Sequence, residues 1–179
     1  MNVRDMSDDQ YRIFFAVCRS VRYHDRRRAF FEQLHRISAG LTVLLAGSVL
    51  FELSRPGESA WWITCIALAA ALLAAFDIVI GYAFRANLHF DLKRRFGELE
   101  MAVVSGDNND EIWKRHQLER LRIEQDEPAI FRALDVLCHN ELLRAQGVGR
   151  GEEGKTGFIE LSRWKRWTCH FLPWGNLTL

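Results

Sequence analysis

The stretch AWWITCIALAAALLAAFDIVIGYAF, residues 60–84, decides the fold of this chain. Asp77 is its only charged side chain, and as a helix it would extend about 37 Å, enough to cross a hydrocarbon core of about 30 Å. A second apolar run, residues 37–53, precedes it and would extend about 25 Å, so it spans only if its helix begins earlier or the bilayer thins. We therefore predict a transmembrane hairpin with spans 37–53 and 60–84 and an outer loop 54–59.

Basic residues flank the hairpin on both sides, whereas its connecting loop holds only Arg55. Because positive charge is retained in the cytoplasm, both termini are expected there. Tryptophans favour the membrane interface, and arginines favour its cytoplasmic side. The predicted interface residues next to the spans are therefore Trp61, Trp62, Arg26, Arg27 and Arg28. The alternative is a buried hairpin in a soluble helical protein, but the rest of the chain is too polar to surround such a helix.

Outside the spans, apolar residues recur every three or four positions, which indicates helices. Residues 1–36 are predicted to form a basic approach helix that enters the first span. Residues 85–146 are predicted to be a cytoplasmic helical region, in which the second span continues as one long helix, Asn108 caps the next, and Glu127-Pro128 opens another. No segment shows strand alternation. The expected fold is all-α: a membrane protein with a two-helix transmembrane hairpin and a cytoplasmic helical bundle.

The end of the chain divides in two. Residues 147–157 are rich in glycine and charge and are predicted to be a flexible linker. Residues 158–179 alternate aromatic and basic side chains, which predicts a basic amphipathic helix with Trp164 and Trp167 at the membrane interface. The same stripe would equally suit docking on the cytoplasmic bundle or on a second subunit.

Motifs that carry chemistry are weak here. Residues 149–156, GRGEEGKT, match the phosphate-binding P-loop pattern, but a helix is predicted before them and two glutamates lie within them, so nucleotide binding is not expected. Cys138-His139 and Cys169-His170 are poor zinc ligands because neighbouring residues on a helix diverge by about 100°. We expect no enzyme, no catalytic residue, no metal or cofactor, no nucleic-acid partner, and free thiols at all four cysteines.

Asp77 is the polar residue to explain within the spans. Counting from Trp61 places it in the cytoplasmic third of the bilayer, near the depth of Gly40. It could pair with Arg36 or His35, or it could face a water-filled interior built by several copies of the hairpin. Two helices cannot enclose a pore, so conduction requires oligomers. Small residues predicted to pack the helices together are Gly40, Gly47, Ala67, Ala70, Ala71 and Ala74.

From Tyr11 to Ala145 the chain resembles the SLATT family, the SMODS and SLOG-associating two-transmembrane effectors of bacteria. The likeness rests on the basic segment Arg22-Tyr23-His24-Asp25-Arg26-Arg27-Arg28, the tight hairpin, the long helix after it, and the segment from Glu127-Pro128 to Cys138-His139-Asn140-Glu141-Leu142. The resemblance implies an inner-membrane effector of antiphage or other conflict systems, held quiet until a cytoplasmic sensor or nucleotide-signal partner triggers it. It implies no catalytic residues.

The expected function is therefore an oligomeric effector that perturbs the lipid bilayer when triggered and causes growth arrest or cell death. In that scheme Asp77 hydrates or gates the path. The alternative is a membrane anchor or scaffold that conducts nothing and recruits a cytoplasmic partner.

Overall fold

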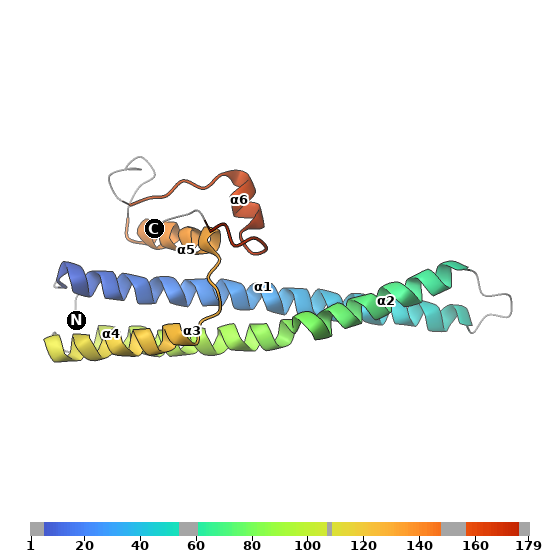
Figure 1. The fold of residues 1–179 in the computed structure, drawn as a ribbon, viewed down its shortest axis with the longest axis horizontal. Coiled ribbons are helices and arrows are strands. Elements are labelled where there is room, and N and C mark those ends of the chain that lie inside the picture. The colour runs from blue at the N-terminus through green and yellow to red at the C-terminus, as the bar shows by residue number, and fades with distance from the viewer. Residues whose placement is uncertain (1–5, 54–60, 107–108, 148–156, 176–179) are drawn as a thin grey trace. The chain divides into compact units, whose positions relative to one another are not determined.

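The computed structural model describes residues 6–53, 61–106, 109–147 and 157–175, and all regular elements in these ranges are helices (Figure 1). This confirms the all-α class for that part of the chain. The predicted outer loop 54–59, most of the predicted linker 147–157 and the P-loop-like residues 149–156 lie outside it. The helices are α1 Asp8–Leu53, α2 Trp61–Ile80, α3 Tyr82–Ser105, α4 Asp110–Gln125, α5 Arg132–Ala145 and α6 Arg163–Thr168.

The chain forms two compact units. Unit 1 comprises residues 1–27 and 89–179, and unit 2 comprises residues 28–88. The borders fall inside α1 and α3, whereas hydropathy predicts them at residues 36 and 85. The two sets of borders differ because hydropathy marks where the helices change from polar to apolar, whereas the compact units are defined by contacts between residues.

Unit 2 pairs the second half of α1 with α2. Two stretches, Asp8–Phe51 and Trp61–Ser105, are long and apolar enough to cross a membrane, with mean hydropathy of 1.5 and 2.5 in their most apolar windows. Only 6% and 11% of those windows are buried, whereas the core helix of a soluble protein would be mostly buried. The soluble alternative is therefore not favoured by this structure.

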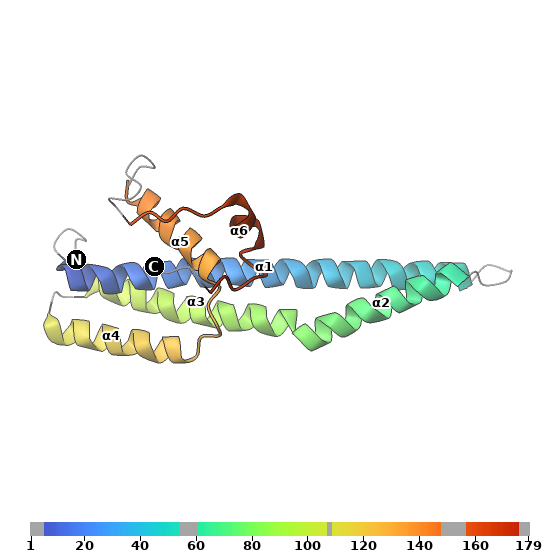
Figure 2. The ribbon, with the colours of Figure 1, turned by 45° about the horizontal axis from the view of Figure 1, so that its top comes forward.

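Gly81, inside the predicted second span, interrupts the helix that was predicted to run on from that span without a break. After the span, residues 85–105 form part of a single helix, as predicted. Gly81 has φ of +65°, the left-handed region that glycine enters without steric cost, and it separates α2 from α3 (Figure 2). Its N–H still bonds to the Asp77 carbonyl at 2.9 Å, and Arg85 Nε donates to the Ile80 carbonyl at 2.9 Å. The interruption is therefore a turn whose backbone groups remain satisfied.

Unit 1 is built on the first part of α1, the last part of α3, and α4, α5 and α6. The periodic apolar positions of α1 and α3 form its core as predicted, with Val17, Phe96 and Leu92 no more than 1% exposed. α4 returns beside α3 (Figure 2), held where Arg95 of α3 bonds to Asp126 at 2.6 Å. α5 contributes the most completely buried face, which includes Ala133, Leu134, Val136 and Cys138.

The starts of α4 and α5 differ from the predicted ones. α4 is capped by Asn109, whose Oδ1 accepts from the Glu111 N–H at 3.0 Å, and the predicted cap Asn108 lies outside the described residues. α5 begins at Arg132, not at Pro128. The segment before it stays extended because the Phe131 N–H donates to the Tyr23 hydroxyl at 3.0 Å and Glu127 points into unit 1.

The tail is not the long amphipathic helix that its spacing predicts. Only α6, of 6 residues, is helical between residues 157 and 175. The irregular segment before it is fixed to α5, because the Asn140 side chain bonds to both the N–H and the carbonyl of Ile159, at 3.0 and 2.6 Å. Cys169, after α6, is buried against Tyr23, Leu134 and Cys138. The docking alternative is therefore realised for part of the tail.

Candidate functional site: a polar pair in the hairpin and a buried polar cluster

Within unit 2, Asp77 pairs with His35. The ring nitrogen Nδ1 of His35 lies 3.1 and 3.3 Å from the two carboxylate oxygens, and the Ser38 hydroxyl reaches the Leu73 carbonyl at 3.5 Å. The predicted His35 partner is confirmed, whereas Arg36 points to Glu32 and is 80% exposed. Asp77 was predicted to lie near the level of Gly40 on the first span. It lies instead beside His35, five residues before Gly40 in the chain. The pair puts two ionisable groups in the contact between α1 and α2.

The predicted packing residues divide into two sets. Ala70 is buried within the hairpin and Ala74 partly so, whereas Gly40, Gly47, Ala67 and Ala71 are exposed. A Cβ added at Gly40 or Gly47 would meet nothing within 4 Å. These exposed small residues therefore do not serve the contact between α1 and α2, and they leave flat surface on the outside of unit 2.

The predicted interface residues also differ among themselves. Trp61 and Trp62 are 79% and 40% exposed. Arg26 forms an ion pair with Glu141, and Arg28 Nε pairs with Glu32 at 2.7 Å. Arg27 is only 4% exposed. The three arginines are therefore engaged by the protein itself. Sequence spacing allows the pair of Arg28 and Glu32, four positions apart on one helix, but not the long-range contacts of Arg26 and Arg27.

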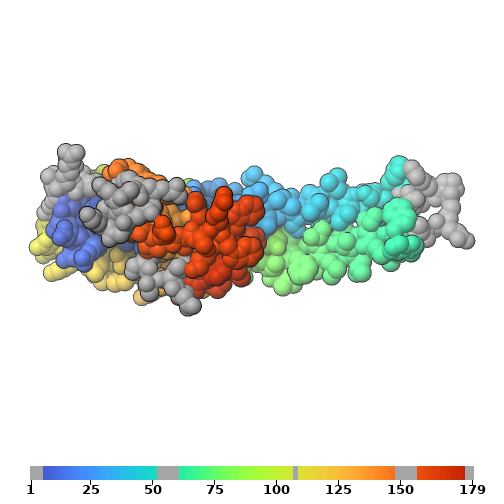
Figure 3. All heavy atoms as spheres, turned by 90° about the horizontal axis from the view of Figure 1, so that it is seen from above, coloured from blue at the N-terminus to red at the C-terminus, as the bar shows by residue number. Residues whose placement is uncertain are grey.

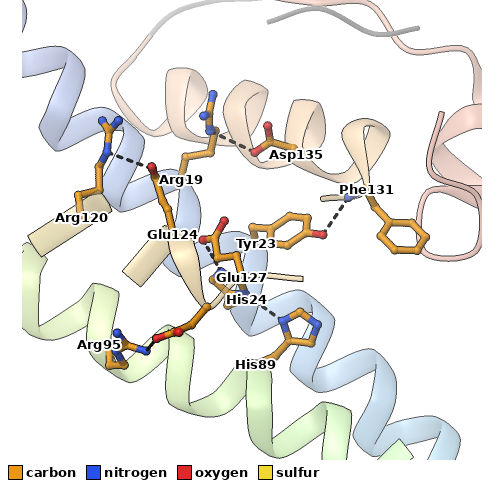
Figure 4. Close-up of polar contacts among 11 residues, drawn as sticks. Arg19, Tyr23, His24, His89, Arg95, Arg120, Glu124, Glu127, Phe131 and Asp135 are labelled. Carbon is orange, nitrogen blue, oxygen red and sulfur yellow. Dashed lines mark hydrogen bonds and ion pairs between the residues drawn. The ribbon is translucent and has the colours of Figure 1, made fainter. Parts of the chain in front are cut away.

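Unit 1 contains a buried polar cluster of Glu127, His24 and His89 (Figure 4). Nε2 of His24 lies 3.0 Å from Glu127 Oε1, and its Nδ1 lies 2.9 Å from Nδ1 of His89. His24 and His89 are 1% and 3% exposed, and the Glu127 side chain 8%. His24 also stacks on Phe96, with ring centroids 5.6 Å apart. The cluster joins α1, α3 and the segment between α4 and α5.

The partners decide where the protons lie. A carboxylate only accepts, so His24 donates to Glu127 through Nε2–H, and its Nδ1 then accepts from Nδ1–H of His89. The two bonds therefore fix which nitrogen of each imidazole carries its proton.

Two of the other contacts in Figure 4 link α1 to α5 and to the residue before it. Arg19 pairs with the buried Asp135 at 3.1 Å, and the Tyr23 hydroxyl accepts from the Phe131 N–H. Burial raises the pKa of Asp135, and the charge of Arg19 opposes that rise. Burial also raises the pKa of Tyr23 to about 12, so it remains a neutral phenol. These contacts tie α5 to α1 through polar groups that have little access to water.

Sequence reasoning missed the polar cluster. Its residues come from three segments, and Glu127 was interpreted as a helix cap. One signal in the sequence could have indicated this cluster. His24 and His89 lie near positions of their helices that are buried, Tyr23 and Leu92. A histidine on the buried face of a helix needs a polar partner, but the sequence of that helix does not identify the partner.

The cysteine–histidine pairs do not form a metal site in the described part of the chain. No group of three or more His, Cys, Asp or Glu side chains there is arranged so that it could hold a metal ion. All four cysteines are free thiols, as expected. Cys138 and Cys169 instead lie in the same apolar cluster. Burial raises the pKa of Cys138 to about 12 and also raises that of Cys169, so both thiols stay protonated.

His170 makes the docking of the tail sensitive to acid. Burial first, and then Arg27 and Arg26, lower the pKa of His170 from 6.5 to about 4. Above pH 6.5 the histidine is neutral whether the tail is docked or not. Between pH 6.5 and 4 only the undocked histidine takes up a proton, so docking weakens as the pH falls, by about 1–2 kcal/mol after allowance for solvent.

We expect Cys169 to become more reactive over that pH range. Modification by 2,2′-dithiodipyridine, located by peptide mass spectrometry, should accelerate relative to Cys138 between pH 6.5 and 4. His170→Gln should abolish the acceleration, whereas His116→Gln should retain it. A Cys169 rate that follows Cys138 at every pH would contradict the assignment.

Comparison with protein-family models, curated proteins and solved structures found no match to this chain. A function must therefore rest on the geometry of its own residues.

Proposed function

We propose that this chain is an inner-membrane effector of a bacterial antiphage or other conflict system, with both termini in the cytoplasm. In this proposal it self-associates and perturbs the bilayer when a cytoplasmic sensor or nucleotide-signal partner triggers it, and growth stops. The resemblance in architecture supports the biological setting. The geometry of unit 2 supports the membrane position and the self-association.

The observation that carries the proposal is the outer surface of unit 2. Large apolar side chains such as Ile78 and Val79 are 81% and 82% exposed, which water would penalise and lipid would not. On α1, Gly40 and Gly47 leave open space, because an added Cβ would meet nothing within 4 Å. Small residues let helices approach closely in lipid, where packing and not hydrophobicity drives association. The large apolar residues of this surface therefore suit contact with lipid, and the small residues suit contact with further copies of the chain.

The pair of His35 and Asp77 gives such an assembly a polar feature. An ionisable pair is costly inside a membrane and is retained where it serves structure or a polar path. The Asp77 side chain is 22% exposed and that of His35 is 44% exposed, so both still reach the surface of unit 2. In an assembly of several copies, one pair from each hairpin would bring water into the apolar layer.

Depolarisation of the bacterial membrane tests this function. We expect induced expression to depolarise cells carrying a potential-sensitive dye, more strongly when phage infection supplies the trigger. Gly47→Leu should weaken the response about tenfold, which corresponds to about 1.4 kcal/mol, because the larger side chain prevents close approach of neighbouring helices. Asp77→Asn should also weaken it while keeping an acceptor for His35.

Ala46→Leu is the matched control, since Ala46 is exposed on α1 but lies about 100° away from Gly47 around the helix. It should depolarise like the original chain. A membrane that stays polarised while the triggered protein is fully inserted would contradict the effector function.

The same outcome would favour the alternative, a membrane scaffold. One observation supports that alternative: α3 and α4 carry large exposed apolar residues, among them Met101 at 65% and Leu118 at 57%. Such residues suit a protein partner. A scaffold would bind that partner equally well with Gly47→Leu, which separates it from the effector.

A further inference from the structure

The tail carries a second surface that the hairpin does not explain. Trp164, Trp167 and Phe171 are 67%, 85% and 64% exposed. Trp164 and Trp167 lie three residues apart on α6 and so share one side of it, and Phe171 lies in the turn that follows. Figure 3 shows this part of the tail on the surface of unit 1. We call Arg163, Trp164, Lys165, Arg166, Trp167 and Phe171 the α6 patch. Exposed aromatic residues in such a group indicate an interaction site.

The tail beside the α6 patch is attached to unit 1 by a buried side chain and by hydrogen bonds. Cys169 is 3% exposed in the core of unit 1, and Arg27 donates to the His170 carbonyl at 2.8 Å. Farther along, the Arg132 N–H donates to the Pro173 carbonyl at 3.2 Å. The buried side of the tail is therefore already satisfied by α1 and α5. The aromatic side remains exposed because it is turned away from these contacts.

The charge of the α6 patch is positive. Within the described part of the chain, no carboxylate lies within ion-pair distance of Arg163 or Arg166. Both line a cleft of about 370 Å³ with Trp167, Arg26, Leu137 and Glu141. Arg26 and Glu141 neutralise each other, so Arg163 and Arg166 supply the net charge. Two guanidinium groups beside an aromatic wall are suited to a phosphodiester.

We propose that the α6 patch binds anionic phospholipid of the membrane that holds the hairpin, with the headgroup phosphate in the cleft and the tryptophans at the interface. The inference rests on the proposed membrane position. Arg27, to which the tail is fixed, precedes the apolar run at Ile37 by ten residues, and ten residues extend at most about 35 Å. The length of chain between them therefore allows the patch to reach the bilayer. Basic residues are attracted to anionic lipid, and tryptophan has an apolar body and a polar edge that match the interface.

Fluorescence quenching by lipid tests this proposal on the full chain. The protein would carry Trp61→Phe and Trp62→Phe, which leaves buried Trp113, partly buried Trp174 and the two tryptophans of the α6 patch. It would be placed in nanodiscs whose lipids are brominated near the headgroup. We expect quenching to be about twofold greater with roughly three parts phosphatidylcholine to one part phosphatidylglycerol than with phosphatidylcholine alone.

Two sets of variants locate the effect. Arg163→Gln, Lys165→Gln and Arg166→Gln together should remove the dependence on phosphatidylglycerol. Lys114→Gln, Arg115→Gln and Arg122→Gln remove the same charge from exposed positions on α4 and should retain it. Trp164→Phe with Trp167→Phe should remove the lipid-quenched signal itself.

Quenching that is absent, or equal in neutral and anionic discs, would overturn the proposal. Crosslinking between copies through the α6 patch without lipid quenching would overturn it in favour of a second copy as the occupant. A parallel protein that keeps Trp61 and Trp62 reports insertion. If those two are quenched and the α6 patch is not, only this inference fails; if they are not quenched either, the proposed membrane position fails with it.

Discussion

Replacing Glu127 with alanine is expected to lower the free energy of unfolding of unit 1 by about 3 kcal/mol. Glu127 is the acceptor for His24 Nε2–H at 3.0 Å, and the imidazole is 1% exposed, so water cannot replace the lost oxygen. The change would also free the tautomer of His24 on which the bond to His89 depends. The melting temperature should fall by about 10 °C.

Thermal unfolding of the detergent-solubilised full chain can be measured by the exposure of its buried thiols. In a Cys65→Ser background, a thiol-reactive fluorophore reports only Cys18, Cys138 and Cys169, all of which are buried in unit 1. Glu127→Gln keeps an acceptor oxygen and should recover most of the stability.

Asp126 is the matched control for this substitution. It neighbours Glu127, but its side chain is 59% exposed and its bond to Arg95 lies at the surface. Asp126→Ala should therefore cost less than about 1 kcal/mol. Equal losses for Asp126→Ala and Glu127→Ala would show that the polar cluster contributes nothing beyond a surface ion pair.

What periodicity could predict was burial along single helices. Phe14, Val17 and Cys18 of α1 and Leu92 and Phe96 of α3 are buried where their spacing placed them. The two apolar helices could also be predicted, because a long uninterrupted apolar run has few alternatives. Each of these features is encoded within one stretch of sequence.

Features that join distant segments could not be predicted in this way. Glu127 and Pro128 match the start of a helix, yet the Phe131 N–H is satisfied by Tyr23, which lies 108 positions earlier, so α5 begins only after it. Gly81 offered a local signal, but a glycine inside a helical pattern is often tolerated, and only its φ of +65° reveals the turn. The prediction of a long helix in the tail was wrong for a related reason. The spacing of its aromatic residues is helical, but hydrogen bonds from Asn140 hold the segment at Ile159 in a non-helical conformation.

Replacing Arg27 with alanine is expected to release the tail from unit 1. The guanidinium of Arg27 donates to the His170 carbonyl at 2.8 Å and lies 4.1 Å from the centre of the Phe131 ring, so one buried side chain joins α1, the start of α5 and the end of α6. Alanine removes the bond, the ring contact and the packing of the stem, which together should weaken docking by about 2 kcal/mol. Local opening should then expose Cys169 about thirtyfold more often.

Thiol modification of Cys169 at neutral pH, with Cys18 and Cys138 as internal references, distinguishes release of the tail from unfolding of unit 1. Arg27→Ala should accelerate the modification of Cys169 far more than that of Cys18 or Cys138. Arg27→Lys keeps a donor but loses the planar group over Phe131, so it should be intermediate. Arg28→Ala is the adjacent control, because Arg28 pairs with Glu32 in unit 2. Acceleration of all three thiols together, or equal effects of Arg27→Ala and Arg28→Ala, would show that Arg27 supports unit 1 generally and does not hold the tail.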